Sequence, residues 1–235
     1  MIFRTNLIER LNREWNFFGK DEGKNDKFVD GKRKETVVPY RDRVGDYWLS
    51  IPTAQYNSLV AKYAKSYGKL DGSIDIAWSA AFISYCMQAA GAGKQFPYDS
   101  GHQNWMKLSI KNRLADKLSA PLVGYRVDEF PLEVGDLIGA PREEFKNLTY
   151  DQIPTAGWFK SHSDVIVEIN KPKKRAYVIG GNVGQSVSKV EIKIDADGRL
   201  ADTQRNWVVH IRNNIKTSDV PVALTAEAKA GAMVG

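Results

Sequence analysis

The sequence has a single cysteine, no long apolar run and no apolar leader, and each absence excludes a class of protein. One cysteine excludes an intramolecular disulfide and any metal site built from several cysteines. No apolar run reaches the length of a membrane span. The N-terminal segment lacks the apolar core of a secretory signal, so we expect no export by that route.

The composition is that of a globular domain. Hydrophobic residues make up 43% and charged residues 26% of the 235 residues, so the chain can bury a sizeable core. The formal net charge of +6 suits an anionic partner such as nucleic acid or a cell-wall polymer, or simply a solubilising surface. Lysine and arginine are interspersed with acidic residues, and the densest basic run, 171–175, falls at an expected turn. We therefore expect no nucleic-acid partner.

The first half of the chain has helical periodicity. Apolar residues at spacings of three and four predict several amphipathic helices around a loop at 19–34. Residues 78–90 are apolar on most faces, which predicts a buried central helix ending near Gly91. The other expected helices cover residues 5–18, 38–50, 54–67 and 103–115.

The second half alternates with a period of two, which predicts strands. Residues 141–160 interrupt this pattern as a long irregular insertion that carries Trp158 and Phe159. Helices followed by an antiparallel sheet of about five strands predict an α+β fold. The strands are expected at about 131–138, 163–169, 175–181, 186–194 and 206–213.

The expected elements divide the chain into three parts. Residues 1–50 form an N-terminal helical extension packed on, or leading into, the core. Residues 51–216 form the main domain, and residues 217–235 form a flexible C-terminal tail rich in alanine and threonine.

Ser79 stands near the expected start of the buried central helix. The opening turn of a helix has unpaired N–H groups and the positive end of the macrodipole, which stabilise an oxyanion formed on an attacked carbonyl. A serine hydroxyl stays protonated near neutral pH, so this nucleophile would need a histidine as general base. Serine is also a favoured helix cap, and simple capping is the alternative interpretation.

His162 is the candidate base. On an extended strand it shares one face with Asp164, whereas Ser163 and Val165 share the opposite, core-facing side. A single histidine is usually structural, but this one begins a strand that immediately precedes a second candidate strand.

Asn182 follows that second strand. Hairpin pairing across the turn near 170–175 is expected to bring Asn182 close to His162. Asn182 would hold one ring nitrogen and leave the other to face Ser79, with Asp164 as the second candidate for this orienting role. Asparagine is also common in turns, so a turn role is the alternative.

The cysteine and the other histidines have simpler interpretations. Cys86 lies about 10 Å along the central helix from its start, so we interpret it as a buried structural residue. His102 lies in a loop that could line a site. A metal site made from His102, His162 and Asp164 is an alternative without a tight ligand motif, and we expect neither metal nor cofactor. His210 alternates with apolar residues, which predicts an exposed side chain.

Several segments, taken in order, carry a family resemblance over about residues 10–213. They are RVGDYW (43–48), WSAAFIS (78–84), FPY (96–98) with His102, GDL (135–137), HSDVIV (162–167) and IGGNV (179–183). These segments resemble a bacterial domain family of unassigned function that is related to the NlpC-type and CHAP cysteine amidases. The resemblance implies a papain-like fold with Ser79 at the nucleophile position, His162 as base and Asn182 as the third member. It also implies that serine is usual at this position within the branch.

The leading hypothesis is a cell-wall-directed hydrolase that cleaves an amide bond in peptidoglycan stem peptides. Trp78, Trp158 and the loop of His102 would line its cleft. Such a chain would be an antibacterial toxin with an immunity or delivery partner, or a phage-type lysin. It would be made in the cytoplasm and reach the periplasm or cell wall by a specialised secretion route or by lysis. The alternatives are a catalytically inactive papain-like binding module, and an esterase or acyltransferase using the same Ser–His pair.

Overall fold

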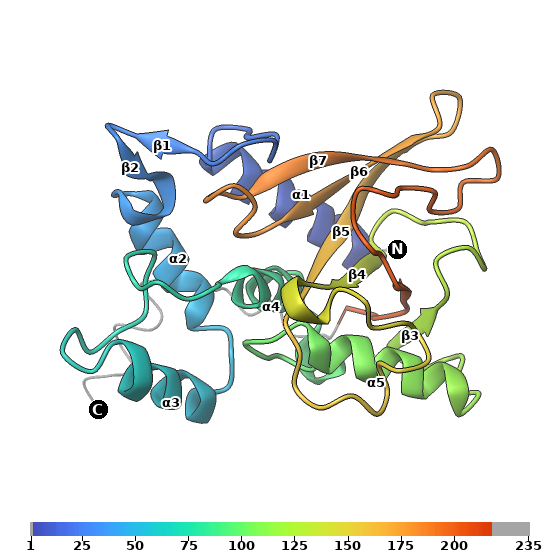
Figure 1. The fold of residues 1–235 in the computed structure, drawn as a ribbon, viewed down its shortest axis with the longest axis horizontal. Coiled ribbons are helices and arrows are strands. Elements are labelled where there is room, and N and C mark those ends of the chain that lie inside the picture. The colour runs from blue at the N-terminus through green and yellow to red at the C-terminus, as the bar shows by residue number, and fades with distance from the viewer. Residues whose placement is uncertain (1, 218–235) are drawn as a thin grey trace.

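A computed structural model describes residues 2–217 of the chain, and Figure 1 shows helices gathered around a twisted sheet. The helices are α1 (Ile2–Phe17), α2 (Tyr40–Trp48), α3 (Thr53–Tyr63), α4 (Ser79–Ala89) and α5 (Gln103–Leu114). Three short 3-10 turns are η1 (Lys34–Thr36), η2 (Gly93–Gln95) and η3 (Glu143–Phe145). Each expected helix therefore has a counterpart, with ends shifted by a few residues.

The strands form a small ribbon and one larger antiparallel sheet, which confirms the α+β class. The ribbon pairs β1 (Phe28–Val29) with β2 (Lys32–Arg33), inside the expected loop. The sheet has the order β3-β8-β4-β5-β6-β7. Its strands are β3 (Leu122–Tyr125), β4 (Leu137–Pro141), β5 (Ser161–Asn170), β6 (Arg175–Gly180), β7 (Ser188–Lys193) and β8 (Val209–Asn213). Strand β3 was not predicted, because its four buried residues are too few to show alternation.

Helix α4 occupies the centre of the molecule, as its apolar composition predicts. It packs against α1, α2, β5 and β6. Figure 1 shows α2 and α3 at one end and the sheet with α5 at the other, with α4 between them. Helix α4 therefore lies against the sheet at strand β5.

Both faces of the sheet are buried, which corrects the expectation for His210. Ile138 pairs with His210 across β4 and β8, and Ile138 belongs to a second apolar cluster that includes Leu132 and Trp207. His210 is fully buried, and its Nε2 lies 2.8 Å from Asp136 Oδ2. Alternation predicts a polar face, but chain segments outside the sheet cover that face.

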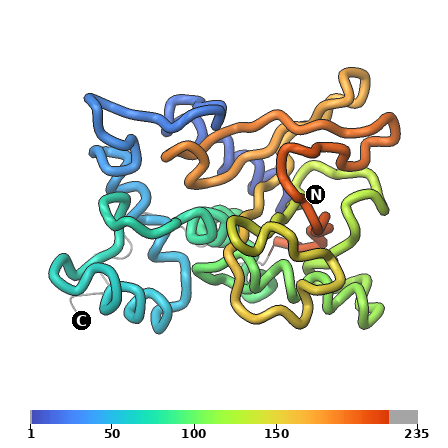
Figure 2. Tube along the Cα trace, viewed as in Figure 1, coloured from blue at the N-terminus to red at the C-terminus, as the bar shows by residue number. Residues whose placement is uncertain are grey.

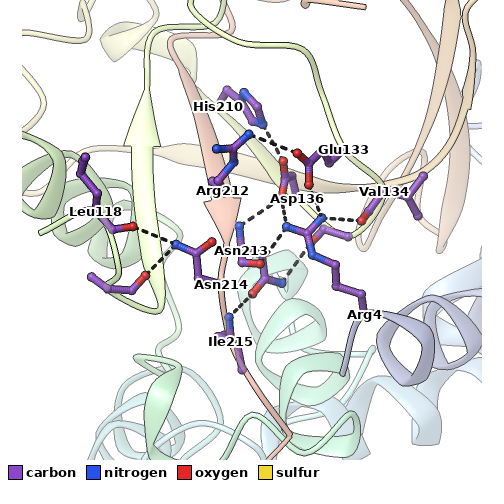
Figure 3. A network of polar contacts seen from close by, with 12 residues as sticks. Arg4, Leu118, Glu133, Val134, Asp136, His210, Arg212, Asn213, Asn214 and Ile215 are labelled. Carbon is purple, nitrogen blue, oxygen red and sulfur yellow. Dashed lines mark hydrogen bonds and ion pairs between the residues drawn. The ribbon is translucent and has the colours of Figure 1, made fainter. Parts of the chain in front are cut away.

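The same aspartate ties the N-terminal helix to the sheet (Figure 3). Arg4 of α1 donates from Nη2 to Asp136 Oδ1 at 2.7 Å and from Nη1 to the Val134 carbonyl at 2.7 Å. The backbone N–H of Asn213 donates to Asp136 Oδ1 at 3.0 Å. Phe3 and Leu7 of α1 enter the same apolar cluster as α4. Helix α1 is therefore packed on the core.

The insertion at 141–160 lies over α5 in the trace of Figure 2. The N–H of Phe159 donates to Gln103 Oε1 at 2.6 Å, and Lys107 Nζ donates to the Gly157 carbonyl at 2.6 Å. Phe159 is buried, whereas Trp158 is 63% exposed.

The expected flexible tail lies almost entirely outside the described residues. Among residues 2–217, no helix combines the length and the apolar character needed to cross a membrane.

Candidate active site

Ser79 is the first residue of α4 and does not hold its cap position. The cap position is held by Trp78, whose side chain makes no capping hydrogen bond. The first helical hydrogen bond runs from the Phe82 N–H to the Trp78 carbonyl at 3.0 Å. The N–H groups of residues 79–81 therefore precede the helical ladder, at the positive end of the helix dipole.

The side-chain partner of Ser79 is His102. Ser79 Oγ lies 2.7 Å from His102 Nε2. His102 stands at the N-terminal cap of α5, so two helix starts meet at this contact. Ser79 is 6% exposed and His102 is 2% exposed. The hydroxyl and the imidazole are thus shielded from bulk water but within proton-transfer distance.

The other nitrogen of His102 continues the chain of hydrogen bonds. His102 Nδ1 lies 2.7 Å from Ser163 Oγ on β5, and Trp105 Nε1 donates to the same oxygen at 2.8 Å. An indole N–H is donor only, so Ser163 must accept from Trp105. The Ser163 hydroxyl can then accept from His102 as well, or donate to it. The first arrangement leaves Nε2 free to accept the Ser79 proton, and the second makes Nε2 the donor to Ser79.

A second pair lies beside the first. His162 Nε2 donates to Asp164 Oδ1 at 2.7 Å, and the rings of His102 and His162 have centroids 5.2 Å apart. Arg205 donates to Asp164 Oδ2 at 3.5 Å. His162 is fully buried, and its Nδ1 has no hydrogen-bond partner among the described residues. Asp164 therefore holds His162 in one tautomer with a free acceptor nitrogen.

Burial determines the protonation states of these groups. Burial lowers the pKa of His102 well below its usual value, and any protonation of neighbouring His162 would lower it further, whereas Asp164 acts in the opposite direction. Burial also lowers the pKa of His162, although Asp164 opposes the shift. For Asp164 burial raises the pKa, but the charge and hydrogen bond of His162 outweigh it and bring the pKa to about 2. Both imidazoles are therefore neutral at pH 7, and Asp164 is ionised.

Comparison with known proteins places the chain in a bacterial family. A family model described as an uncharacterized protein conserved in bacteria (DUF2272) matches residues 35–216. The chain belongs to this family. The matched range begins after α1 and includes Ser79, His102 and the His162–Asp164 pair. Comparisons with curated proteins and with solved structures gave no match.

In this member of the family, the predicted site residues are paired differently from the expectation. Ser79 bonds to His102, which sequence reasoning placed only in a lining loop, and not to His162. His162 bonds to Asp164, the second candidate orienter. Asn182 adopts a φ of 54° in the turn after β6, and no side-chain hydrogen bond joins it to His162 in the described structure.

Of the two tryptophans expected to line the cleft, Trp78 is buried in the core and Trp158 lies at the surface. Trp78 is 1% exposed, donates from Nε1 to Glu35 Oε2 at 2.7 Å, and stacks on Phe18. It is a core residue that supports the start of α4. Trp158 is held at the surface against Phe145, with ring centroids 5.9 Å apart.

Two further expectations concern metal ligands and Cys86. Among residues 2–217, no group of three or more His, Cys, Asp or Glu side chains is arranged to hold a metal ion. Cys86 is a buried free thiol, as predicted, and burial raises its pKa well above the usual value. A thiol so shielded is a poor nucleophile.

Sequence reasoning missed Ser163 and Trp105. Alternation assigned Ser163 to the core-facing side of β5, and it is indeed fully buried. A buried hydroxyl on a core face needs hydrogen-bond partners, and this need was the signal that could have marked it.

Proposed function

We propose that the chain is a serine-dependent hydrolase of acyl compounds, with Ser79 as nucleophile and His102 as general base. The observation that carries the proposal is the 2.7 Å contact between Ser79 Oγ and His102 Nε2 at the start of α4. A neutral imidazole in contact with the hydroxyl is what the attack step needs.

The reaction would proceed in two halves. Ser79 Oγ forms a bond to the substrate carbonyl carbon while its proton passes to His102 Nε2. The negative charge that develops on the carbonyl oxygen is stabilised by the free N–H groups that open α4. The carbon–nitrogen bond then breaks, and His102 returns the proton to the departing amine. Water attacks the acyl-serine by the same route and releases the acid.

The hydrogen-bonded pair of His162 and Asp164 lies next to His102. Burial is the main cause of the low pKa of His102, and His162 and Asp164 act on that pKa in opposite directions. We assign this pair a positioning role, because no hydrogen bond joins His162 to Ser79 in the described structure.

For the substrate, we propose an amide bond in peptidoglycan stem peptides. The ordered segments resemble a family related to the NlpC-type and CHAP amidases, and that resemblance supports this choice. A buried central helix packed against an antiparallel sheet is compatible with the papain-like fold that the resemblance implies. Delivery to the cell wall by a specialised secretion route or by lysis, with an immunity or delivery partner, belongs to the same proposal.

The test is release of muropeptides from purified peptidoglycan by the full chain and three variants. Ser79→Ala should abolish release. His102→Ala should lower the rate by about 10²- to 10⁴-fold, the usual contribution of a general base. His162→Ala should lower it less. No release by the parent, or equal release by Ser79→Ala, would refute the hydrolase. A larger loss in His162→Ala than in His102→Ala would make His162 the base.

A second candidate is a non-catalytic binding module on the same fold. It is favoured by the hydrogen-bond order in which Ser163 donates to His102 and His102 donates to Ser79. That order satisfies the buried Ser163 hydroxyl but leaves Ser79 without a base. Ser79→Cys separates the two cases, since activity gained from an inert parent identifies a site that has lost catalysis. A panel of activated esters run in parallel tests the esterase alternative.

A further inference from the structure

One line of hydrogen bonds runs through four side chains, from the Trp105 indole to the Ser79 hydroxyl. Trp105 Nε1 bonds to Ser163 Oγ, and the same oxygen lies 2.7 Å from His102 Nδ1. His102 Nε2 lies 2.7 Å from Ser79 Oγ. Within residues 2–217, Ser163 Oγ has no other hydrogen-bond partner, and Ser79 Oγ has none besides His102. The protons of the two hydroxyls and the imidazole therefore depend on one another.

The indole limits how Ser163 can bond. Trp105 can only donate, so it occupies one lone pair of Ser163 Oγ and leaves the hydroxyl one lone pair and its own proton for His102. In the accepting order, Ser163 accepts from His102 Nδ1, and Ser79 donates to Nε2. In the donating order, Ser163 donates to Nδ1, and Nε2 donates to Ser79. The two orders differ in which nitrogen of the neutral imidazole carries the proton.

Burial favours the donating order, because each order leaves one hydroxyl proton without an acceptor among residues 2–217. In the accepting order that proton belongs to Ser163, which is fully buried. In the donating order it belongs to Ser79, which is 6% exposed and can donate to water. The donating order also aligns every bond from indole to serine, so that each bond polarises the next. A buried donor without an acceptor is costly, so the donating order should exceed the other by about tenfold or more.

We propose that Ser163 is a positioning residue, which in the resting molecule holds the proton of His102 on Nε2. The inference rests on the proposed hydrolase and adds a control of its general base. While Nε2 donates to Ser79, it cannot take the serine proton. For attack, Nε2 releases one proton to water and Nδ1 takes one from water, so the imidazole stays neutral. The Ser163 hydroxyl rotates and accepts from Nδ1. Only the minor, accepting order is therefore ready to react.

The first test locates the proton by long-range ¹⁵N–¹H correlation on the full chain labelled at histidine, near pH 7.5. The chain has three histidines, which makes the spectrum sparse. His162 and His210 serve as internal references for a proton on Nε2, because Nε2 of each lies within 2.8 Å of an aspartate oxygen. His102→Gln identifies the remaining signals. His102 should give the pattern of the two references, and a proton on its Nδ1 in the parent would overturn the proposal.

The second test changes the partner of Nδ1. An ionised carboxylate can only accept, so Ser163→Asp should bring a proton to His102 Nδ1. It should also raise muropeptide release by about tenfold or more, because the reactive order then dominates. The matched control is Ser161→Asp, which adds the same charge at the start of β5 without a hydrogen bond to His102. The control should change neither the proton position nor the rate.

Ser163→Ala covers the case in which the aspartate variant does not fold. The proton should stay on Nε2, because Ser79 still accepts there. A shift to Nδ1 in Ser163→Ala, no proton on Nδ1 in a folded Ser163→Asp, or an equal effect of Ser161→Asp would each overturn the proposal. An unchanged rate of Ser163→Asp in an active parent would overturn the control of the base. The expected proton positions, with no cleavage by any variant, would refute the hydrolase but keep the control of the tautomer by Ser163.

Discussion

The imidazole of His102 has a different hydroxyl on each side, and neither partner is a carboxylate. Ser79 and Ser163 lie 2.7 Å from its two nitrogens. A carboxylate partner would fix the tautomer, whereas a hydroxyl can donate or accept. The only neighbouring carboxylate-bound histidine is His162, through Asp164. The site therefore contains a serine–histidine contact and a histidine–aspartate pair as two adjacent units.

The buried neutral histidines predict a pH dependence of stability. The pKa values of His102 and His162 are lowered in the folded state, so the unfolded chain binds protons first as pH falls. Stability present above about pH 6.5, the unfolded value, is lost below it, at up to about 1.4 kcal/mol per pH unit for each histidine. Asp164, with a pKa of about 2, adds a loss confined to pH values below about 4.

Urea unfolding between pH 7.5 and pH 5 checks this prediction. His102→Gln should have a shallower pH slope than the parent, by up to about 1.4 kcal/mol per pH unit. Between pH 7.5 and pH 9 the two slopes should agree, since no histidine titrates there. Identical slopes in the acid range would show that His102 is not held neutral by the fold.

At the scale of elements, the glycines that end β6 leave room for the site. An added Cβ on Gly180 would lie 1.8 Å from Asp164 Oδ1 and 3.2 Å from His162 Nε2. An added Cβ on Gly181 would lie 2.6 Å from Phe82 in α4. In the sequence this pair stands out only as part of the segment IGGNV at 179–183. Glycine is required at both positions because Gly180 lies close to β5 and Gly181 lies close to α4.

Gly180→Ala is therefore expected to displace the Asp164 carboxylate and lower the free energy of unfolding. Overpacking of a filled site costs typically about 1–3 kcal/mol. Gly157→Ala is the control, because an added Cβ there meets nothing within 4 Å. Its effect should stay within about 0.5 kcal/mol. Chemical denaturation of both variants gives the comparison, and equal stabilities would contradict the packing described here.

At the scale of the whole molecule, Arg4 links the two ends of the described chain. It reaches from α1 to Asp136 before β4 and donates from Nη2 to the Asn213 carbonyl in β8 at 2.8 Å. Asp136 is fully buried, and its carboxylate contacts both Arg4 and His210. Figure 3 shows these groups converging on one carboxylate.

Arg4→Ala should destabilise the fold by about 2–3 kcal/mol. Loss of one partner from a buried ion pair costs about 3–5 kcal/mol, and the partial exposure of Arg4 reduces that cost. Arg13→Ala on the same helix is the control, since Arg13 is exposed. Both are compared by urea unfolding. A loss no larger than that of Arg13→Ala would mean that α1 is not held to the sheet through Asp136.

The sequence by itself determined the class of fold, the buried central helix with Ser79 at its start, the strand that begins at His162, and the burial of Cys86. These features follow from local periodicity and composition, which act over a few residues. Only the tertiary structure decided which imidazole meets Ser79, which carboxylate holds His162, and why His210 is buried. Those outcomes depend on how α5, β5 and the loops pack against one another. Such contacts join residues far apart in the chain, and no local pattern records them.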